Sequence, residues 1–173
     1  RSPPYLTWAP PAAFTNLSAA GTLDWLHVGY GGSTNAIRMA KPPTGAFIGN
    51  VTWTAAPATF SNCPTALSWT DGTARAPTVA NSTTGVYNTA AFSVSVDLTA
   101  APGALFPVTV SLFAGAYGGA RGQLDVSADA AGTWFNDDLL PPSGVSATVR
   151  YDVVLAAPTT VTATWSMQNR DTD

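Results

Sequence analysis

Residues 91–98 read AFSVSVDL and residues 108–114 read VTVSLFA, with an apolar side chain at nearly every second position. After a glycine-rich stretch at 115–122, the alternation returns as QLDVS at 123–127. A period of two places one face of a strand in the protein interior and the other in solvent. A helix, with its period of 3.6 residues, would not keep these apolar positions on one side. These stretches therefore predict β-strands.

The rest of the chain supplies further short strand-like stretches, separated by glycine- and proline-rich breaks. The short connection AAPT at 156–159 predicts that the last two stretches form a β-hairpin. Residues 130–144 are expected to form a loop. We expect a second sheet, supplied by 22–30 and 148–167, to cover the apolar faces of the stretches quoted first. The other expected strands are 14–17, 22–30, 35–40, 46–55, 67–73, 84–88, 148–155 and 160–167.

About nine to eleven short strands joined by Gly/Pro turns are typical of two packed sheets. The sequence therefore predicts an all-β protein, and more narrowly a two-sheet antiparallel β-sandwich of jelly-roll-like form. It contains no internal repeat and no linker between domains. We expect one β-sandwich domain over 19–173, preceded by an extended proline-rich segment over 1–18.

Charged residues make up only 10% of the chain, against about 25% in ordinary soluble domains. The net charge is -3, glutamate is absent, and Lys41 is the only lysine. Such a chain lacks the basic cluster that nucleic acid requires and the run of about 20 apolar residues that membrane insertion requires. A weakly charged surface rich in Ser and Thr suits a secreted, extracellular protein that carries glycans or assembles. The start at Arg1, without Met, fits a processed mature form.

The first 13 residues are proline-rich, with paired prolines on both sides of YLTW at 5–8. Prolines favour an extended backbone and exclude a helix. A segment of this kind is ordered only when something holds it. We expect it to dock on its own domain or on a neighbouring subunit. The residues expected at this interface are Tyr5, Leu6, Trp8 and Phe14.

Several short motifs occur in a fixed order along the chain. They are GTLDWLH at 21–27, LSWTDGT at 67–73, TGVY at 84–87, LFAGAY at 112–117, RGQL at 121–124, Tyr151 and TATW at 162–165. Together they resemble an extracellular β-sandwich module that occurs alone or appended to secreted bacterial carbohydrate-active proteins. The resemblance covers roughly 17–165 and implies a non-catalytic module. This chain departs from that module in its proline-rich start and in its glycosylation sequons.

The overall layout is also similar to subunits of extracellular glycoprotein fibres in which a terminal strand completes the neighbouring sandwich. That resemblance implies polymerisation by strand exchange.

Three Asn-X-Ser/Thr sequons begin at Asn16, Asn50 and Asn81, and none has proline at its middle position. Each is therefore a chemically competent acceptor for an N-linked glycan. We expect covalent glycans on the protein; the alternative is that these asparagines serve turns and strand ends.

Residues suited to catalysis are few. His27 is the only histidine and lies in an apolar stretch, so a packed imidazole is favoured over a catalytic base. Cys63 is the only cysteine and is expected to be a buried small side chain, with an interchain disulfide as the alternative. A glycosidase needs two carboxylates, but Asp24, Asp71 and Asp152 lie where strands and turns use Asp structurally. We expect no enzyme activity, no catalytic residue and no cofactor.

Oxygen-bearing side chains gather in the expected loop at 129–138. Asp129, Asn136, Asp137 and Asp138 are ligands of the kind Ca²⁺ uses. The EF-hand spacing is absent, so a solvated loop is favoured and no metal site is predicted.

Aromatic residues divide into two groups. Those in expected strands are assigned to the core: Trp25, Trp69 and Trp165. Those in the expected loop and in the glycine-rich turn are candidates for an exposed sugar-stacking surface: Trp134, Phe135 and Tyr117.

The sequence favours a non-enzymatic structural subunit of an extracellular glycoprotein fibre or helical filament. It would assemble head to tail through its N-terminal segment, by adding a strand to the next subunit. The alternative is a secreted carbohydrate-binding, lectin-like β-sandwich module, and a hydrolase is the third class.

Overall fold

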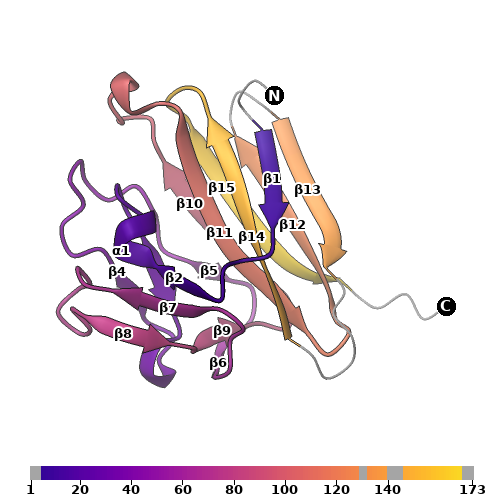
Figure 1. Ribbon diagram of the computed structural model, residues 1–173. Helices are drawn as coiled ribbons and strands as arrows, with labels where there is room; N and C mark the ends of the chain where they lie inside the picture. The colour runs from indigo at the N-terminus through magenta and orange to yellow at the C-terminus, as the bar shows by residue number, and fades with distance from the viewer. Residues whose placement is uncertain (1–4, 129–131, 140–145, 169–173) are drawn as a thin grey trace.

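The chain folds into short strands arranged in several sheets, all antiparallel except for one parallel strand pair (Figure 1). The computed structural model describes residues 5–128, 132–139 and 146–168. These residues are mostly β, which confirms the prediction of an all-β protein. The strands are β1 (Tyr5–Ala9), β2 (Phe14–Asn16), β3 (Leu26–Val28), β4 (Ala36–Arg38), β5 (Thr52–Trp53), β6 (Ala58–Phe60), β7 (Ala66–Trp69), β8 (Val79–Ser82), β9 (Gly85–Tyr87), β10 (Ala91–Asp97), β11 (Val108–Tyr117), β12 (Arg121–Ala128), β13 (Gly132–Leu139), β14 (Ser146–Leu155) and β15 (Thr160–Gln168). The short helices are α1 (Leu17–Ala20), η1 (Tyr30–Gly32) and η2 (Gly103–Leu105).

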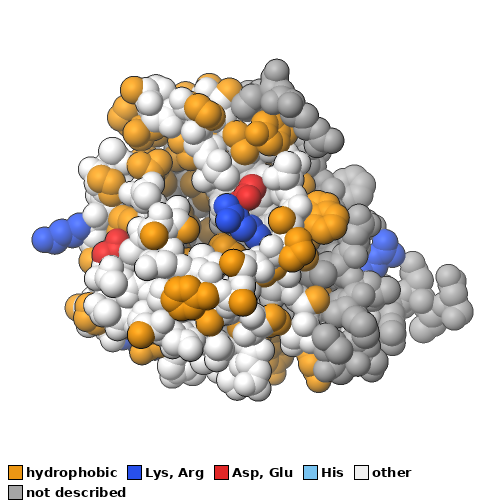
Figure 2. Space-filling view, viewed as in Figure 1, with side chains coloured by type: hydrophobic (Ala, Val, Ile, Leu, Met, Phe, Trp, Pro, Cys, Tyr) orange, Lys and Arg blue, Asp and Glu red, His pale blue; other side chains and the backbone are white. Residues whose placement is uncertain are grey.

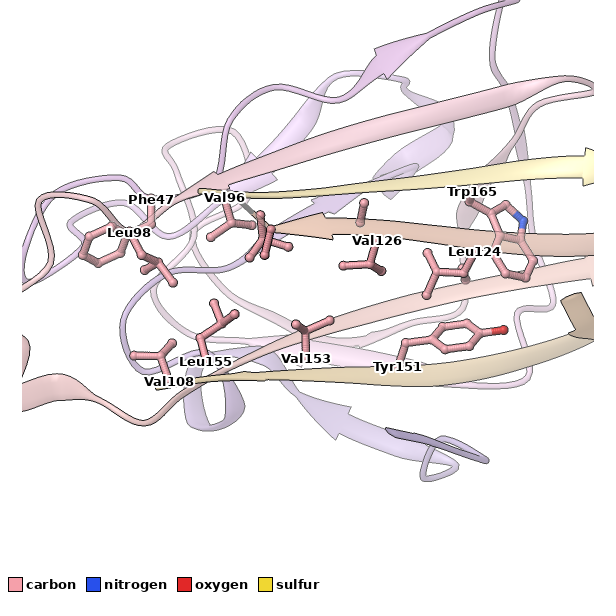
Figure 3. Packing of buried hydrophobic residues seen from close by; sticks show 14 of the residues in the cluster. Phe47, Val96, Leu98, Val108, Leu124, Val126, Tyr151, Val153, Leu155 and Trp165 are labelled. Carbon is pink, nitrogen blue, oxygen red and sulfur yellow. The ribbon is translucent and has the colours of Figure 1, made fainter. Parts of the chain in front are cut away.

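Two sheets contribute buried side chains to the main hydrophobic cluster. Their strand orders are β1-β14-β11 and β13-β12-β15-β10-β5. In β14, every second residue from Val149 to Leu155 is buried, and the residues between are partly exposed. Figure 3 shows Val153 of β14 and Val126 of β12 pointing toward one another across the cluster. Burying one such side chain stabilises the fold by about 1.5–3 kcal/mol, so the period of two directly produces the core.

A second, smaller cluster surrounds Trp69, whose side chain is fully buried. The rings of Trp25, His27 and Tyr30 pack against it with centroid separations of 5.5, 5.6 and 5.4 Å. Its indole N–H donates to the carbonyl of Ala76 at 2.8 Å. The small sheets β2-β7-β8, β3-β4 and β6-β9 lie together in the lower part of Figure 1.

The segment at Phe47 and Ile48 joins the two clusters. The Oδ2 atom of Asp24 accepts the backbone N–H groups of both residues at 2.9 Å. The guanidinium group of Arg38 donates to the carbonyl of Ile48. Phe47 is buried in the main cluster, and Ile48 forms a β-bridge with Val96 of β10. Asp24 and Arg38 therefore fix the segment that connects the small sheets to the facing ones.

The structure corrects the predicted strand pairing. β14 and β15 were expected to form a hairpin, but they lie in different sheets. The stretches quoted first, now β10 and β11, are likewise divided between the two sheets. Alternation specifies which face of a strand is buried, but it does not specify the neighbouring strand. A short connection can join strands of two facing sheets, as 156–159 does, as well as two neighbouring strands of one sheet.

Several predicted boundaries also change, and the strand expected over 46–55 shrinks to β5. The segment expected to be a loop at 130–144 contains β13, which pairs with β12. The strand expected over 22–30 shrinks to β3. The strands expected at 35–40, 67–73 and 84–88 are confirmed in shorter form as β4, β7 and β9. The three tryptophans assigned to the core are buried as predicted: Trp25, Trp69 and Trp165.

Candidate functional site

β1 forms one edge of the three-stranded sheet. It pairs antiparallel with β14, from Tyr5 opposite Val154 to Ala9 opposite Arg150. In Figure 1 the indigo β1 lies among the orange and yellow strands. The N-terminal segment thus docks beside the C-terminal half of the chain. Of the interface residues expected from the sequence, Tyr5, Leu6 and Trp8 lie in β1, and Phe14 begins β2.

The two faces of β1 have different surroundings. Directly opposed residues of antiparallel strands share a face, so Leu6 lies on the same face as its buried partner Val153. Leu6 packs against the main cluster. Trp8 shares the face of the buried Tyr151, yet it is 56% exposed. Thr7 lies on the outer face and is exposed. β1 therefore adds an aliphatic side chain to the core and leaves a large aromatic ring at its border.

A short proline hinge connects β1 to the rest of the chain. Residues 10–12 read PPA, and the carbonyl of Ala13 accepts the N–H of Ala66 at 2.9 Å. The chain is therefore anchored again directly after the hinge. Every other strand of the two facing sheets in the described chain comes from residues 52–168. In the sequence, the residues of the smaller cluster therefore lie between β1 and the strands β11 and β14 of the sheet that β1 completes.

Aromatic side chains are exposed along this N-terminal segment. Trp8 is 56% exposed and Phe14 is 53% exposed. Exposed rings of this size are enriched at contact surfaces between proteins. Trp8 lies in β1 and Phe14 begins β2, on either side of the hinge. We therefore take the surface around the hinge as a candidate contact surface.

A polar group lies on the outer face of β14 and β11. Arg150 Nε and Ser111 Oγ donate to the same Oδ1 atom of Asp152, at 2.8 and 2.6 Å. Arg150 Nη2 also donates to Ser111 Oγ at 3.3 Å. Sequence reasoning missed this group because Ser111 meets Asp152 only through the register of β11 on β14. An exposed pair of this kind contributes about 0–1 kcal/mol, so its main effect is to keep this face hydrophilic.

The three carboxylates considered for hydrolysis are each engaged by different partners. Asp71 Oδ1 accepts the Trp25 indole N–H at 2.9 Å and the Ser18 hydroxyl. Asp24 holds two backbone N–H groups, and Asp152 belongs to the outer-face group. All three therefore have structural partners of their own. Within the part of the chain that the structure describes, no three His, Cys, Asp or Glu side chains gather to hold a metal ion.

The structure describes the side chain of only one of the three candidate sugar-stacking residues. Tyr117 ends β11 and is 65% exposed. Trp134 and Phe135 belong to β13, opposite Val126 and Asp125 of β12. Their side chains lie outside the described part of the structure, as do Asp129 and the side chains of the calcium candidates Asn136, Asp137 and Asp138.

His27 is part of the smaller cluster. It is buried against Trp69, and it hydrogen-bonds the backbone of Thr84. Its Nε2 atom has no hydrogen-bond partner among the described residues. Burial lowers the pKa of His27 to about 4, and the hydrogen bond to Thr84 opposes this shift. The neutral, packed imidazole favoured by the sequence is therefore its folded form.

Acid is expected to destabilise the fold through His27. Because its pKa is about 4 when folded and 6.5 in its ordinary state, the unfolded chain takes up the proton first as the pH falls. The His27 contribution is thus complete above pH 6.5 and is lost between about 6.5 and 4, by on the order of 3 kcal/mol. Urea unfolding of wild type and His27→Phe between pH 6.5 and about 4 measures this loss of stability. A His27→Phe variant with the same pH slope as wild type would contradict this account.

Cys63 is only half-buried, which corrects the expectation of a buried thiol. It follows Asn62, a residue with a positive φ of 69°, and its N–H donates to the carbonyl of Thr83 at 2.8 Å. The turn around it is therefore set by the backbone, and it leaves Cys63 partly exposed.

The chain was compared with protein-family models, with curated proteins and with solved structures, and none of them matches it. In the described residues no helix is long and apolar enough to cross a membrane. The geometry of β1 and its edge therefore carries the functional argument.

Proposed function

We propose that this chain is a structural subunit of an extracellular glycoprotein fibre or helical filament, assembled head to tail through its N-terminal segment. In this proposal the facing sheets form a two-sheet, jelly-roll-like β-sandwich. β1 of one subunit completes the sandwich of the next. The observation that carries the proposal is the place of β1: an edge strand from the far end of the chain, joined to the rest by the PPA hinge at 10–12.

Exchange of β1 between copies preserves its contacts. A second copy presents the same β14 edge, so Leu6 meets the same core there as it does in its own chain. Each backbone hydrogen bond on that edge contributes about 0.5–1.5 kcal/mol net, and the partial burial of Leu6 contributes less than the roughly 3 kcal/mol of a fully buried leucine. A vacant β14 edge would lose all of these contributions. The edge is therefore kept filled, and short hinges such as 10–12 favour filling it from a neighbour.

The exchange has a direction, which determines the kind of assembly. Each subunit has one donor strand, β1, and one acceptor edge, β14. Donor and acceptor are different surfaces, so the contact is head to tail and produces an open filament unless its rotation closes a ring. Main-chain hydrogen bonds would supply affinity, and the side chains facing the core would supply specificity.

A carbohydrate-binding module is the alternative. Its described support is the exposed ring of Tyr117 at the end of β11. A single exposed ring is common on protein surfaces, whereas the docked N-terminal strand requires a specific explanation. Assembly is therefore the function that the geometry supports best.

Changing the core-facing residue of β1 is expected to abolish filaments. Leu6→Asp places a carboxylate against the main cluster, whereas the matched control Ala9→Asp places it on the exposed outer face, opposite Arg150. We expect negative-stain microscopy to show filaments for wild type and Ala9→Asp, and none for Leu6→Asp or for a chain lacking residues 1–9. A synthetic peptide of residues 1–12 should bind the shortened chain and stabilise it against heat. Unchanged filaments after the deletion would contradict the proposal.

A further inference from the structure

All three sequon asparagines are exposed, and they lie on or beside edge strands. Asn16 is the last residue of β2, which is one edge of the sheet β2-β7-β8. Its Oδ1 atom caps α1 by accepting the N–H of Ala19 at 3.1 Å. The cap uses the amide oxygen and does not use the amide nitrogen, which is the atom that carries an N-linked glycan.

Asn81 lies on β8, the opposite edge of the same sheet. The register jumps there, because Leu67 opposes Ser82 while Trp69 opposes Val79. β8 thus has one extra residue opposite β7, and Asn81 lies in this irregular stretch. Bulges at sheet edges interrupt pairing with further strands, so Asn81 marks an edge that is already unsuited to extension.

Asn50 lies along the outer side of β10, in the segment that leads into β5. Gly49 donates its N–H to the carbonyl of Ser95 at 2.8 Å, and Thr52 of β5 pairs with Ser93. Asn50 is exposed between these two attachment points. β5 is an edge of the five-stranded sheet, so the third sequon also stands at a sheet edge.

The second half of the chain contains no sequon. No Asn-X-Ser/Thr triplet occurs after Thr83. β14 and β11 therefore carry none, and β1, the third strand of the proposed assembly sheet, contains no asparagine. Sequons are confined to the edges at β2, β5 and β8.

The edges at β2 and β5 have little other protection, and β8 has its bulge. Natural proteins guard exposed edges with charged side chains, and lysine above all, but this chain has 10% charged residues and one lysine. Figure 2 shows a face on which charged side chains are sparse and most of the described surface is uncharged. A bulky, hydrated glycan takes the role of a charged side chain, because it prevents a second strand from approaching the edge.

We propose that N-glycans on Asn16, Asn50 and Asn81 shield the sheet edges at β2, β5 and β8 from pairing with strands of other chains. The glycans are attached by a sugar donor activated as a phosphate ester. The Asn Nδ2–sugar C1 bond forms as the C1–O bond to phosphate breaks, the phosphate keeps the electron pair, and one amide proton is released. This shielding rests on the sheet edges alone and does not depend on the proposed fibre function.

The test is made on the full chain from a host that attaches N-glycans. The variant Asn16→Ser/Asn50→Gln/Asn81→Gln removes all three acceptors, and serine keeps the cap of α1. Asn35→Gln is the matched control, because Asn35 is exposed and outside any sequon. Intact mass gives occupancy, and light scattering with electron microscopy gives the assembly state. Enzymatic removal of glycans from folded wild-type protein repeats the comparison without any refolding.

We expect wild type and Asn35→Gln to carry three glycans and to form one ordered species. The triple variant and the enzymatically stripped protein should form irregular aggregates. Adding Leu6→Asp, which blocks strand exchange, separates the two proposals: the stripped protein should still aggregate. Absence of glycan at these sites, or identical assembly with and without glycan, would overturn the shielding. Glycan-dependent protection without filaments would uphold the shielding and contradict the fibre.

Discussion

Replacing Gly122 by alanine is expected to destabilise the fold by about 3 kcal/mol. A Cβ atom built on Gly122 would lie 2.0 Å from Cζ2 of Trp165 and 2.6 Å from its Cη2. The indole ring therefore occupies the space beside the bare backbone of β12. Both contacts are far inside van der Waals range, so the ring would have to move.

Movement of the ring would disturb both facing sheets. The Trp165 indole N–H donates to the carbonyl of Gly115 at 3.0 Å, which joins β15 to β11 of the opposite sheet. Its ring also contacts that of Tyr151, with 5.8 Å between centroids. Losing the bond would leave a buried polar group unsatisfied, at a cost of about 1–3 kcal/mol. Against a total stability of roughly 5–15 kcal/mol, this is a large effect.

Chemical denaturation of four variants tests this packing. Gly103→Ala is the matched control, because Gly103 is exposed and a Cβ atom added to it would meet no atom within 4 Å; it should change stability by less than about 0.5 kcal/mol. Trp165→Phe removes the part of the ring nearest Gly122. The double variant Gly122→Ala/Trp165→Phe should therefore be more stable than the sum of the two single effects implies, by about 1 kcal/mol or more. Equal stability of Gly122→Ala and Gly103→Ala would contradict the packing of Trp165 against Gly122.

Local pattern predicted most of the longer strands but not the short strands β6 and β8, and it did not identify strand partners. The alternation at 91–98 and 148–155 correctly identifies buried faces, because side-chain direction depends only on neighbouring residues. The neighbour of a strand depends on contacts between residues that are far apart in sequence. The prediction of a hairpin at 156–159 was therefore wrong. β13 was missed because residues 132–139 read GTWFNDDL, which has no alternation.

The N-terminal site was partly predictable for a similar reason. Apolar residues between prolines indicated a docked segment, and Tyr5, Leu6 and Trp8 do lie in a paired strand. The sequence did not identify β14 as the partner of that strand. It also did not indicate that the Ser111 hydroxyl would bind the Arg150–Asp152 pair, since that contact depends on the register of β11.

Strand exchange is expected to produce a specific covalent link between two different chains. Thr7 of β1 is opposite Asp152 of β14, and the Cα atoms of opposed residues on antiparallel strands lie about 4.5–5.5 Å apart, within the range of about 4.4–6.8 Å found in disulfides. In a Cys63→Ser background, one chain carries Thr7→Cys and a differently tagged chain carries Asp152→Cys. If β1 occupies the neighbour's edge, oxidation of the mixed filaments links the two tags. Thr148→Cys replaces Asp152→Cys in the control, because it lies four residues, or about 13 Å, along the strand.

The most direct measurement is peptide mass spectrometry of this mixed, oxidised sample. The proposal predicts a disulfide between position 7 of one tagged chain and position 152 of the other, and none to position 148. A link at 7–152 that forms only when both cysteines are in one chain, with no link between tagged chains, would show that β1 stays on its own subunit and would contradict assembly by strand exchange.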